Sequence, residues 1–157
     1  MARYPADGML RVQRVPTIVN KAAPTVAELN AGVDVTNFIT KDGIKVPTNQ
    51  NMVDSASLAE TFDAQVPGSF GGPVSVTGIR DNATDTLWDL IVYNLGGYVV
   101  VRRGVTTATA FSATQKVEVY PVQWHEPIPM DPASNELSKF TATAAVTSQP
   151  NLKAVVA

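Results

Sequence analysis

The sequence lacks the residues on which most catalytic and metal sites depend. None of its 157 residues is a cysteine, so disulfides, thiolate metal sites and thiol nucleophiles are excluded, and the redox compartment is undetermined. His125 is the only histidine, and its position beside Trp124 at the end of a predicted strand favours a packed or surface side chain. Because no Gly-x-Ser-x-Gly motif is present either, we predict that the protein is not an enzyme and has no catalytic residue, cofactor or metal.

Two patterns imitate a binding site without completing one. Asp81, Asp85 and Asp89 have the spacing of one helix face, which helix capping and solvation explain better than a metal does. Residues 68–72, Gly-Ser-Phe-Gly-Gly, look like a phosphate loop but lack the Gly-Lys-Ser/Thr ending and a following helix. We interpret them as a turn.

Charge is also scarce. Charged residues make up 17% of the chain, against about a quarter in a typical domain, and the net charge is −2. This balance argues against a general nucleic-acid-binding surface, which depends on Lys and Arg. Arg3, Arg11, Arg14 and Lys21 do gather near the N-terminus, where we interpret them as part of a solvated arm.

Long apolar runs are missing. No stretch approaches the roughly 20 residues that span a bilayer, and no apolar segment of a signal peptide follows the opening Met-Ala-Arg-Tyr-Pro. We therefore expect no membrane anchor. The length suits one domain over residues 1–157, and the abundance of Val, Ala and Thr favours strands.

The clearest periodic stretch is residues 81–97, which we predict to be one amphipathic helix. Asn82 is the expected N-cap, and the Gly pair at 96–97 ends the helix. The side chains on its apolar arc are Leu87, Trp88, Leu90, Ile91, Val92 and Leu95. A single long helix in a β-rich chain packs on a sheet and closes one side of the core. The fold prediction is therefore mainly β, a sandwich or barrel flanked by one helix.

The first part of the chain reads as an arm, a short helix and a long loop. Residues 1–24 form an extended N-terminal arm with a β-like piece at 9–15. Thr25 and Glu28 have the spacing of a capping box, and Gly32 ends the helix that they start. Residues 33–40 alternate as a strand, Asp42-Gly43 is a tight-turn signal, and residues 41–57 read as a long exposed hairpin loop.

The remaining strands follow from alternation. Residues 58–66 and 74–80 are predicted to pair through a turn at 67–73, with one small-polar face. Further strands are predicted at 98–103, at 116–124 with an edge or bulge at Pro121, and at 139–147. Residues 104–112 read as a loop and 126–135 as a stiff proline-rich connection. The C-terminal strand and tail, 136–157, end in an apolar segment that we expect to be docked.

In this order, the elements resemble the major tail tube proteins of long-tailed, non-contractile bacteriophages. The resemblance rests on Thr25-Val26-Ala27-Glu28-Leu29-Asn30-Ala31-Gly32 after the arm, Val33-Asp34-Val35-Thr36 and the hairpin region. It continues through the strands at 58–66 and 74–80, the helix, Lys116-Val117-Glu118-Val119-Tyr120-Pro121-Val122 and Phe140-Thr141-Ala142-Thr143-Ala144. It spans nearly the whole chain and contains no single diagnostic motif.

The resemblance implies a structural virion protein, made in the host cytoplasm, that forms six-membered rings. The rings stack into a tube through which DNA passes without specific binding, and other tail proteins meet the tube ends. In that family the arm, the hairpin loop and the C-terminal segment contact neighbouring subunits. The corresponding expected contact residues are Arg11, Val12, Val15, Ile44, Val46, Met52, Val53, Leu152 and Val155.

A small-polar strand face is the predicted lining of the tube. A lumen poor in Lys and Arg gives DNA no counterion-release affinity that would slow its passage. Arg80, at the end of one of these strands, is an objection if it also points inward, and inverting the strand register would exchange the two faces. The expected lumen residues are Thr61, Asp63, Gln65, Ser75 and Thr77.

Other functions remain open on the sequence alone. A free-standing β-sandwich binding module would need exposed aromatics, and Trp124 with Tyr120 and Tyr98 is the candidate patch. Another virion part, such as a decoration or baseplate protein, shares the β-rich composition, and a bacterial secretion-tube protein is a structural cousin. Polymer formation separates tube proteins from binding modules.

Overall fold

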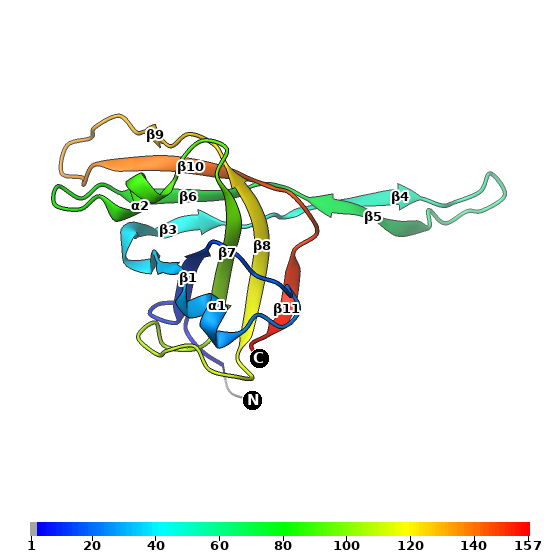
Figure 1. Cartoon of the computed structure of the whole chain (residues 1–157). Coiled ribbons are helices and arrows are strands. Elements are labelled where there is room, and N and C mark those ends of the chain that lie inside the picture. The colour runs from blue at the N-terminus through cyan, green and yellow to red at the C-terminus, as the bar shows by residue number, and fades with distance from the viewer. Residues whose placement is uncertain (1–2) are drawn as a thin grey trace.

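The computed structural model describes residues 3–157, and its strands form one large antiparallel sheet and one separate hairpin (Figure 1). The mainly β class is confirmed, with two short α-helices in place of one long helix. The helical elements are α1 (Val26–Asn30), η1 (Thr36–Phe38, a 3-10 turn) and α2 (Thr86–Leu90). The strands are β1 (Leu10–Val15), β2 (Val33–Asp34), β3 (Ile39–Lys45), β4 (Asn49–Asp54), β5 (Gln65–Gly71), β6 (Val74–Ile79), β7 (Gly96–Arg103), β8 (Lys116–Trp124), β9 (Ile128–Pro129), β10 (Lys139–Val146) and β11 (Asn151–Val155).

The large sheet is open and runs in the order β2-β1-β7-β8-β10-β6-β3. One edge of β8 changes partner along its length, pairing with β11 over residues 116–119 and with β10 over 122–124. Pro121 lies between these two regions, where a strand residue without an N–H loses no ladder bond. The predicted irregularity at this proline is therefore the point at which the sheet divides, and β6 and β10 run across β7 and β8 in Figure 1.

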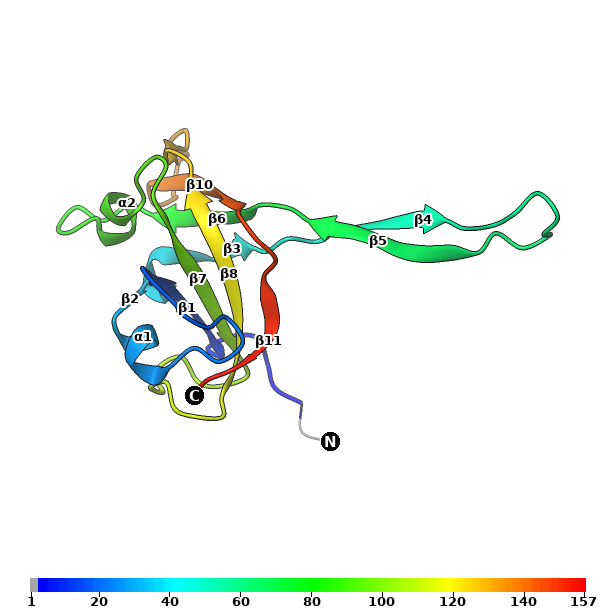
Figure 2. The same cartoon turned by 45° about the vertical axis from the view of Figure 1, so that its right-hand side comes forward.

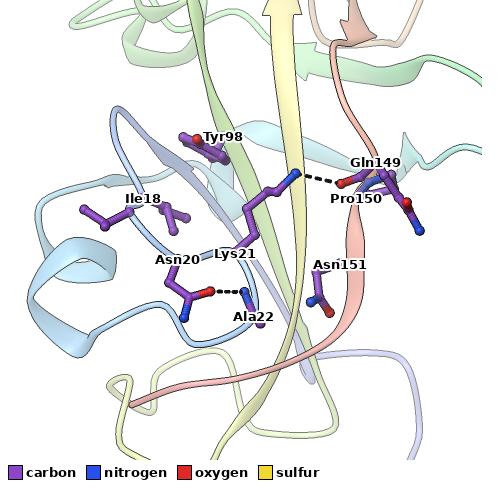
Figure 3. A pocket seen from close by; sticks show the side chains of 9 residues that line it. Ile18, Asn20, Lys21, Ala22, Tyr98, Gln149, Pro150 and Asn151 are labelled. Carbon is purple, nitrogen blue, oxygen red and sulfur yellow. Dashed lines mark hydrogen bonds between the residues drawn. The ribbon is translucent and has the colours of Figure 1, made fainter.

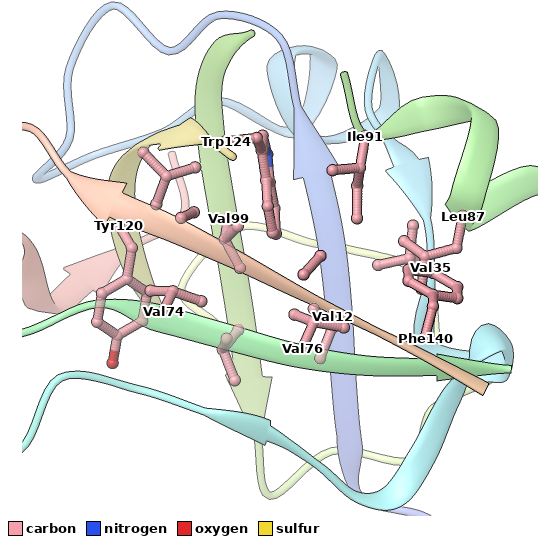
Figure 4. Close-up of a cluster of buried hydrophobic side chains, with 14 residues drawn as sticks. Val12, Val35, Val74, Val76, Leu87, Ile91, Val99, Tyr120, Trp124 and Phe140 are labelled. Carbon is pink, nitrogen blue, oxygen red and sulfur yellow. The ribbon is translucent and has the colours of Figure 1, made fainter. Parts of the chain in front are cut away.

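The first hydrophobic cluster lies between the two halves of the sheet (Figure 4). Burial alternates along β6 and along most of β10, so every second side chain enters this core. Phe140 is fully buried at its centre, and Leu87 and Ile91 close the side nearest α2. Each fully buried Val, Leu, Ile or Phe side chain contributes about 1.5–3 kcal/mol through the removal of apolar surface from water.

A second hydrophobic cluster covers the opposite face of β7 and β8. Val100 of β7 points into it, whereas Val99 and Val101 point into the first cluster, so this strand is buried on both faces. Leu29 of α1 and Ala154 and Val156 of the C-terminal segment cover it. The prediction that the C-terminal tail docks is confirmed, and the apolar run of β7 follows from burial on two sides.

The helix predicted over residues 81–97 is wrong in extent, since α2 covers only Thr86–Leu90. Asn82 is not its N-cap; that position belongs to Asp85, which has a left-handed backbone with φ of 39°. Beyond the helix, Asn94 donates its N–H to the Trp124 carbonyl at 2.8 Å, and Gly96 already belongs to β7. A five-residue helix is below the length that is stable by itself, so pairing with β8 decides where it stops.

The predicted pairing of residues 58–66 with 74–80 is also wrong. Residues 58–64 lie in the tip loop between β4 and β5, and β6 pairs with β10 and β3. The predicted turn at 67–73 is mostly strand, because β5 continues through Pro67 to Gly71. Pro67 faces Met52 beside a register shift, and the exposed hairpin edge tolerates its missing N–H.

The turn predicted at Asp42-Gly43 is part of β3, and the strand predicted at 33–40 is divided into β2 and η1. Gly43 is required for a different reason. A Cβ there would come 2.5 Å from the Thr77 carbonyl oxygen, where β3 meets β6 at a register shift. The glycine marks a close approach inside a bulged strand pair rather than a hairpin turn.

The local predictions around α1 are confirmed. Thr25 caps the helix and Glu28 completes the capping box, with the Thr25 N–H donating to Glu28 Oε2 at 2.8 Å. Residues 10–15 of the predicted arm are β1, which lies within the sheet between β2 and β7. That part of the arm therefore belongs to the body of the chain.

Candidate assembly surfaces

The most exposed part of the molecule is the hairpin arm, which we define as residues 46–73. Its strands β4 and β5 pair only with each other, and Figures 1 and 2 show them extending away from the body. Every residue of β4 is exposed, and most of β5 is too. An isolated two-stranded hairpin is marginally stable in water, and its unpaired edges are templates for another chain.

The arm carries apolar side chains that its own chain does not cover. Leu58 is fully exposed at the tip, and Phe62 and Phe70 are 77% and 53% exposed. Met52, Val53 and Val66 are exposed as well. A concentration of such groups on a projecting element is typical of a protein-contact surface.

The arm is also acidic. Its charged residues are Asp54, Glu60 and Asp63, and no Lys or Arg occurs between Lys45 and Arg80. Asp54 accepts a hydrogen bond from the Ala56 N–H at 2.9 Å, and Glu60 accepts one from the Ser57 N–H at 3.0 Å. These carboxylates shape the tip loop and give it negative charge.

The five predicted lumen residues do not lie on one strand face. Thr61 and Asp63 are in the tip loop of the arm, and Gln65 begins β5. Ser75 and Thr77 are on β6 in the body, half-buried, and they pair with Thr143 and Thr141 of β10. These four residues form a small uncharged face opposite the core, which we call the threonine face: Ser75, Thr77, Thr141 and Thr143.

The predicted contact residues divide by burial. Met52 and Val53 on the arm and Leu152 and Val155 on β11 are exposed. Ile44 and Val46 are partly buried against the first cluster. Val12 and Val15 are 2% and 0% exposed within the chain itself, which leaves them almost no surface for a neighbour. Arg11 lies 3.0 Å from Asp34 and stacks over the Phe111 ring at 4.8 Å.

Arg80 does not stand free at the end of β6. Its guanidinium lies 2.6 Å from the Asp85 carboxylate and 3.8 Å from the centre of the Trp88 ring. Trp88 in turn meets Phe140 edge-to-face at 5.1 Å. These contacts anchor α2 to the sheet. The pairing with Arg80 also explains why an aspartate stands at position 85, so the spacing of Asp81, Asp85 and Asp89 needs no metal. Within residues 3–157 no group of three potential metal-ligating side chains is found.

Arg102 is a buried cation that the sequence analysis did not predict. Its side chain donates to the carbonyls of Thr106, Thr109 and Ala110 at 2.8–3.2 Å and to Gln115 Oε1 at 3.1 Å. The residue is fully buried, and desolvation lowers the pKa of Arg102. Arg102 holds the loop at 104–115 against the body, and its only sequence signal is a charge ending an apolar run.

A groove lies between residues 18–22 and 149–151 and has a volume of about 470 Å³ (Figure 3). Tyr98 and Ile18 line it, and Val19 is 90% exposed at its rim. Lys21 reaches across, donating from Nζ to Ser148 Oγ at 3.1 Å and to the Gln149 carbonyl at 3.0 Å. Segments near both ends of the chain therefore lie side by side and line one groove.

Two of the three aromatics proposed for a binding module are buried, and the third, Tyr98, is half-buried at the groove. Trp124 and Tyr120 are 4% and 3% exposed and belong to the first cluster. Burial and the hydrogen bond to Glu118 raise the pKa of Tyr120. His125 is exposed, with its ring centre 6.3 Å from that of Tyr93. Within the described residues, no helix is long and apolar enough to cross a membrane.

The chain was compared with known protein families and with solved structures, and both comparisons found a match. The family model described as "Phage tail tube protein" matches residues 1–157. This chain belongs to the phage tail tube protein family. The suspected family is thereby confirmed, and the tail tube protein is a structural component of the virion tail rather than an enzyme. Its non-contractile type, which the family description leaves open, stays a prediction.

A solved structure supports the fold of this tail tube protein. It is a chain from the cryo-EM structure of the anti-feeding prophage baseplate, 6-fold symmetrised, with a TM-score of 0.60 at 9% identity. The alignment covers 96% of each chain. At that identity the likeness concerns the fold alone. No curated protein matches the chain.

Proposed function

We propose that this tail tube protein, made in the host cytoplasm, assembles into rings of six copies that stack into a tube. The tube is the conduit for DNA leaving the capsid, and other tail proteins meet its ends. The observation that carries the proposal is the hairpin arm, an acidic and apolar element with both strand edges unpaired. Another copy of the chain would cover these apolar side chains and satisfy the open edges.

Ring closure follows from a head-to-tail contact. If the arm of one copy meets a different surface of the next, the contact is heterologous, and rotation about an axis closes it into a ring. The number six is what the resemblance to tail tube proteins implies, and the assembly that contains the fold neighbour is described as 6-fold symmetrised. Joining copies through β3, the edge of the large sheet, and through the arm would also remove exposed edges.

We assign the tube lining to the threonine face rather than to all five residues named from the sequence. Ser75, Thr77, Thr141 and Thr143 offer hydroxyls without charge, so these four side chains add no cation that phosphates would bind with release of counterions. Lys45, the cross-strand partner of Ser75, and Lys139, two residues before Thr141, lie at the edges of the face. The Arg80 side chain points away from this face, where it pairs with the Asp85 carboxylate and stacks on the Trp88 ring. In assembled tubes a cysteine at Thr77 should react with a small maleimide and resist a large polyethylene glycol maleimide.

The deciding experiment is negative-stain microscopy of the purified protein before and after concentration. Hollow tubes or rings of uniform diameter are the expected result, and their rotational symmetry tests the number six. Monomers that persist at every concentration, and also in the presence of an isolated tail-end complex, would contradict the proposal. A decoration or baseplate role would then be the better explanation.

A further inference from the structure

Lys45 is the one cation of β3, β6 and β10 and their ends that no carboxylate neutralises. The paired cations, with N–O distances of 2.6–3.5 Å, are Lys41 with Asp7, Arg80 with Asp85 and Lys139 with Glu136. Lys45 ends β3, its side chain is exposed, and no carboxylate within residues 3–157 pairs with it. Its ammonium group is therefore available to an anion from outside the chain.

The side chain of Lys45 lies on the same side of the sheet as the threonine face. Its Cα partner is Ser75, whose partner on the other side is Thr143. Directly opposed side chains share one side of a sheet, so these three residues form a row across β3, β6 and β10. The row spans two strand spacings, about 10 Å. The neighbouring pair, Ile44 and Val76, faces the first hydrophobic cluster instead.

The hydroxyls beside Lys45 have no partner within the described residues. The four side chains of the threonine face are half-buried, and none of their hydroxyl oxygens is sealed away from solvent without a hydrogen bond. The one side-chain hydrogen bond that reaches the face, from Thr40 Oγ1, goes to the backbone carbonyl of Thr77 at 3.4 Å. An ammonium group in a row with free hydroxyl donors is a donor set that contacts nucleic-acid phosphates.

We propose that Lys45, together with Ser75 and Thr143, contacts the phosphate backbone of DNA inside the tube. The inference rests on the proposed function, which assigns the threonine face to the lumen. Each copy contributes one ammonium group and no group that reads base edges, so the contact is weak and independent of base sequence. It slows the moving DNA slightly, and salt weakens it through counterion release.

The release of enclosed DNA from assembled tubes measures this contact. Tubes are assembled with a short labelled duplex, nuclease removes the DNA outside, and the escape of the protected duplex is followed from about 50 to about 200 mM salt. Loss of one phosphate contact removes about threefold of the salt effect over this range. Lys45→Gln tubes should therefore release the duplex at least about threefold faster at low salt, with a weaker salt dependence.

Three controls isolate the ammonium group and the phosphates. Glu136→Gln with Lys139→Gln removes a paired anion and cation at the edge of the same face, so these tubes should release DNA at the original rate. Lys45→Arg keeps the charge and should retain the DNA. A peptide nucleic acid duplex, which has no phosphates, should leave all of these tubes at the same rate.

Chemical restoration gives a second test, because the chain has no cysteine of its own. Lys45→Cys tubes should release DNA as fast as Lys45→Gln tubes. Alkylation of the thiolate with 2-bromoethylamine, which displaces bromide and rebuilds an ammonium side chain, should restore the retention. Negative-stain microscopy shows whether each variant forms tubes of the original diameter.

The outcomes separate this contact from the proposed function. If the unaltered chain forms no tubes, the proposed function is wrong and the contact falls with it. If tubes form, but neither Lys45→Gln nor Lys45→Cys speeds the release of DNA, the contact alone is wrong. Equal acceleration of the phosphate-free duplex would overturn it too, and so would a failure of both variants to form tubes, since Lys45 would then act in assembly.

Discussion

The body of the protein and its hairpin arm differ in what stabilises them, although they are neighbours in sequence. In β6 every second residue is buried between two halves of a sheet, whereas in β4 every residue is exposed. The body gains its stability from apolar burial within one chain. The arm has only its own strand pairing, which is marginally stable in water, and under the proposed assembly another copy would stabilise it. Under the proposed assembly, folding would depend on the body and contacts between copies on the arm.

The largest expected effect comes from removing the arm. Lys45 and Ser75 are paired neighbours in β3 and β6, so Asn-Gly in place of residues 46–73 rejoins the strands through a three-residue loop that Val74 completes. We expect complete loss of tube formation in negative stain, with the cooperative melting transition of the body retained. A body that no longer melts cooperatively would show that the arm belongs to the folding unit, and the comparison would fail.

A matched pair of phenylalanine variants sharpens the same contrast. Phe140→Ala empties a fully buried site and should lower the free energy of unfolding by about 3–5 kcal/mol. Phe62→Ala, at a side chain 77% exposed on the arm, should change it by less than about 0.5 kcal/mol. Urea unfolding of the dispersed chains measures both. Equal losses would mean that the arm packs on the body in solution.

Replacing the buried cation should have an intermediate effect within the body. Arg102→Met keeps the length of the side chain but leaves the carbonyls of Thr106, Thr109 and Ala110 without their donor. We expect a loss of about 2 kcal/mol and faster amide exchange over residues 104–115. Unchanged exchange there, measured by mass spectrometry, would contradict the assigned role of Arg102.

The smallest loss expected within the body concerns the cap of α1. Thr25→Ala should cost about 1 kcal/mol at neutral pH. Hydrogen bonds from Thr25 and the Val19 N–H lower the pKa of Glu28, so the stabilisation by its carboxylate is present above its ordinary pKa. That stabilisation is lost as the pH falls through the lowered value. The difference between the two chains in urea unfolding should shrink over that acidic range and not on the alkaline side.

Local patterns were enough for elements whose structure depends on near neighbours. The capping box of Thr25 and Glu28 was predicted because both partners lie three residues apart. Alternation identified β8 and β10, and Pro121 marked an irregularity that proved to be the division of the sheet. For the candidate assembly surfaces, the sequence indicated a long exposed hairpin at residues 41–57. An exposed hairpin is present, but it covers residues 46–73.

The errors occurred where two structures fit one local pattern. The apolar period over residues 81–97 suits a helix, but Leu87 and Ile91 reach the core from a short helix and an extended segment, and Asn94 pairs with β8. Residues 58–66 alternate like a strand, yet only Gln65 and Val66 are in one. Only two of the four residues of the threonine face, Ser75 and Thr77, were named from the sequence. Thr141 and Thr143 lie beside them only because β6 pairs with β10.

The sequence by itself determined the strand-rich class, the capped short helix and the absence of cysteine and of a catalytic motif, because these depend on composition and on residues a few positions apart. The tertiary structure decided the partners of β6, the length of α2 and the separation of arm from body. Those choices depend on contacts between residues far apart in the chain, such as Phe140 with Trp88 and Pro121 at the junction of β10 and β11. Local propensity is too weak to decide between alternatives that differ mainly in what they bury.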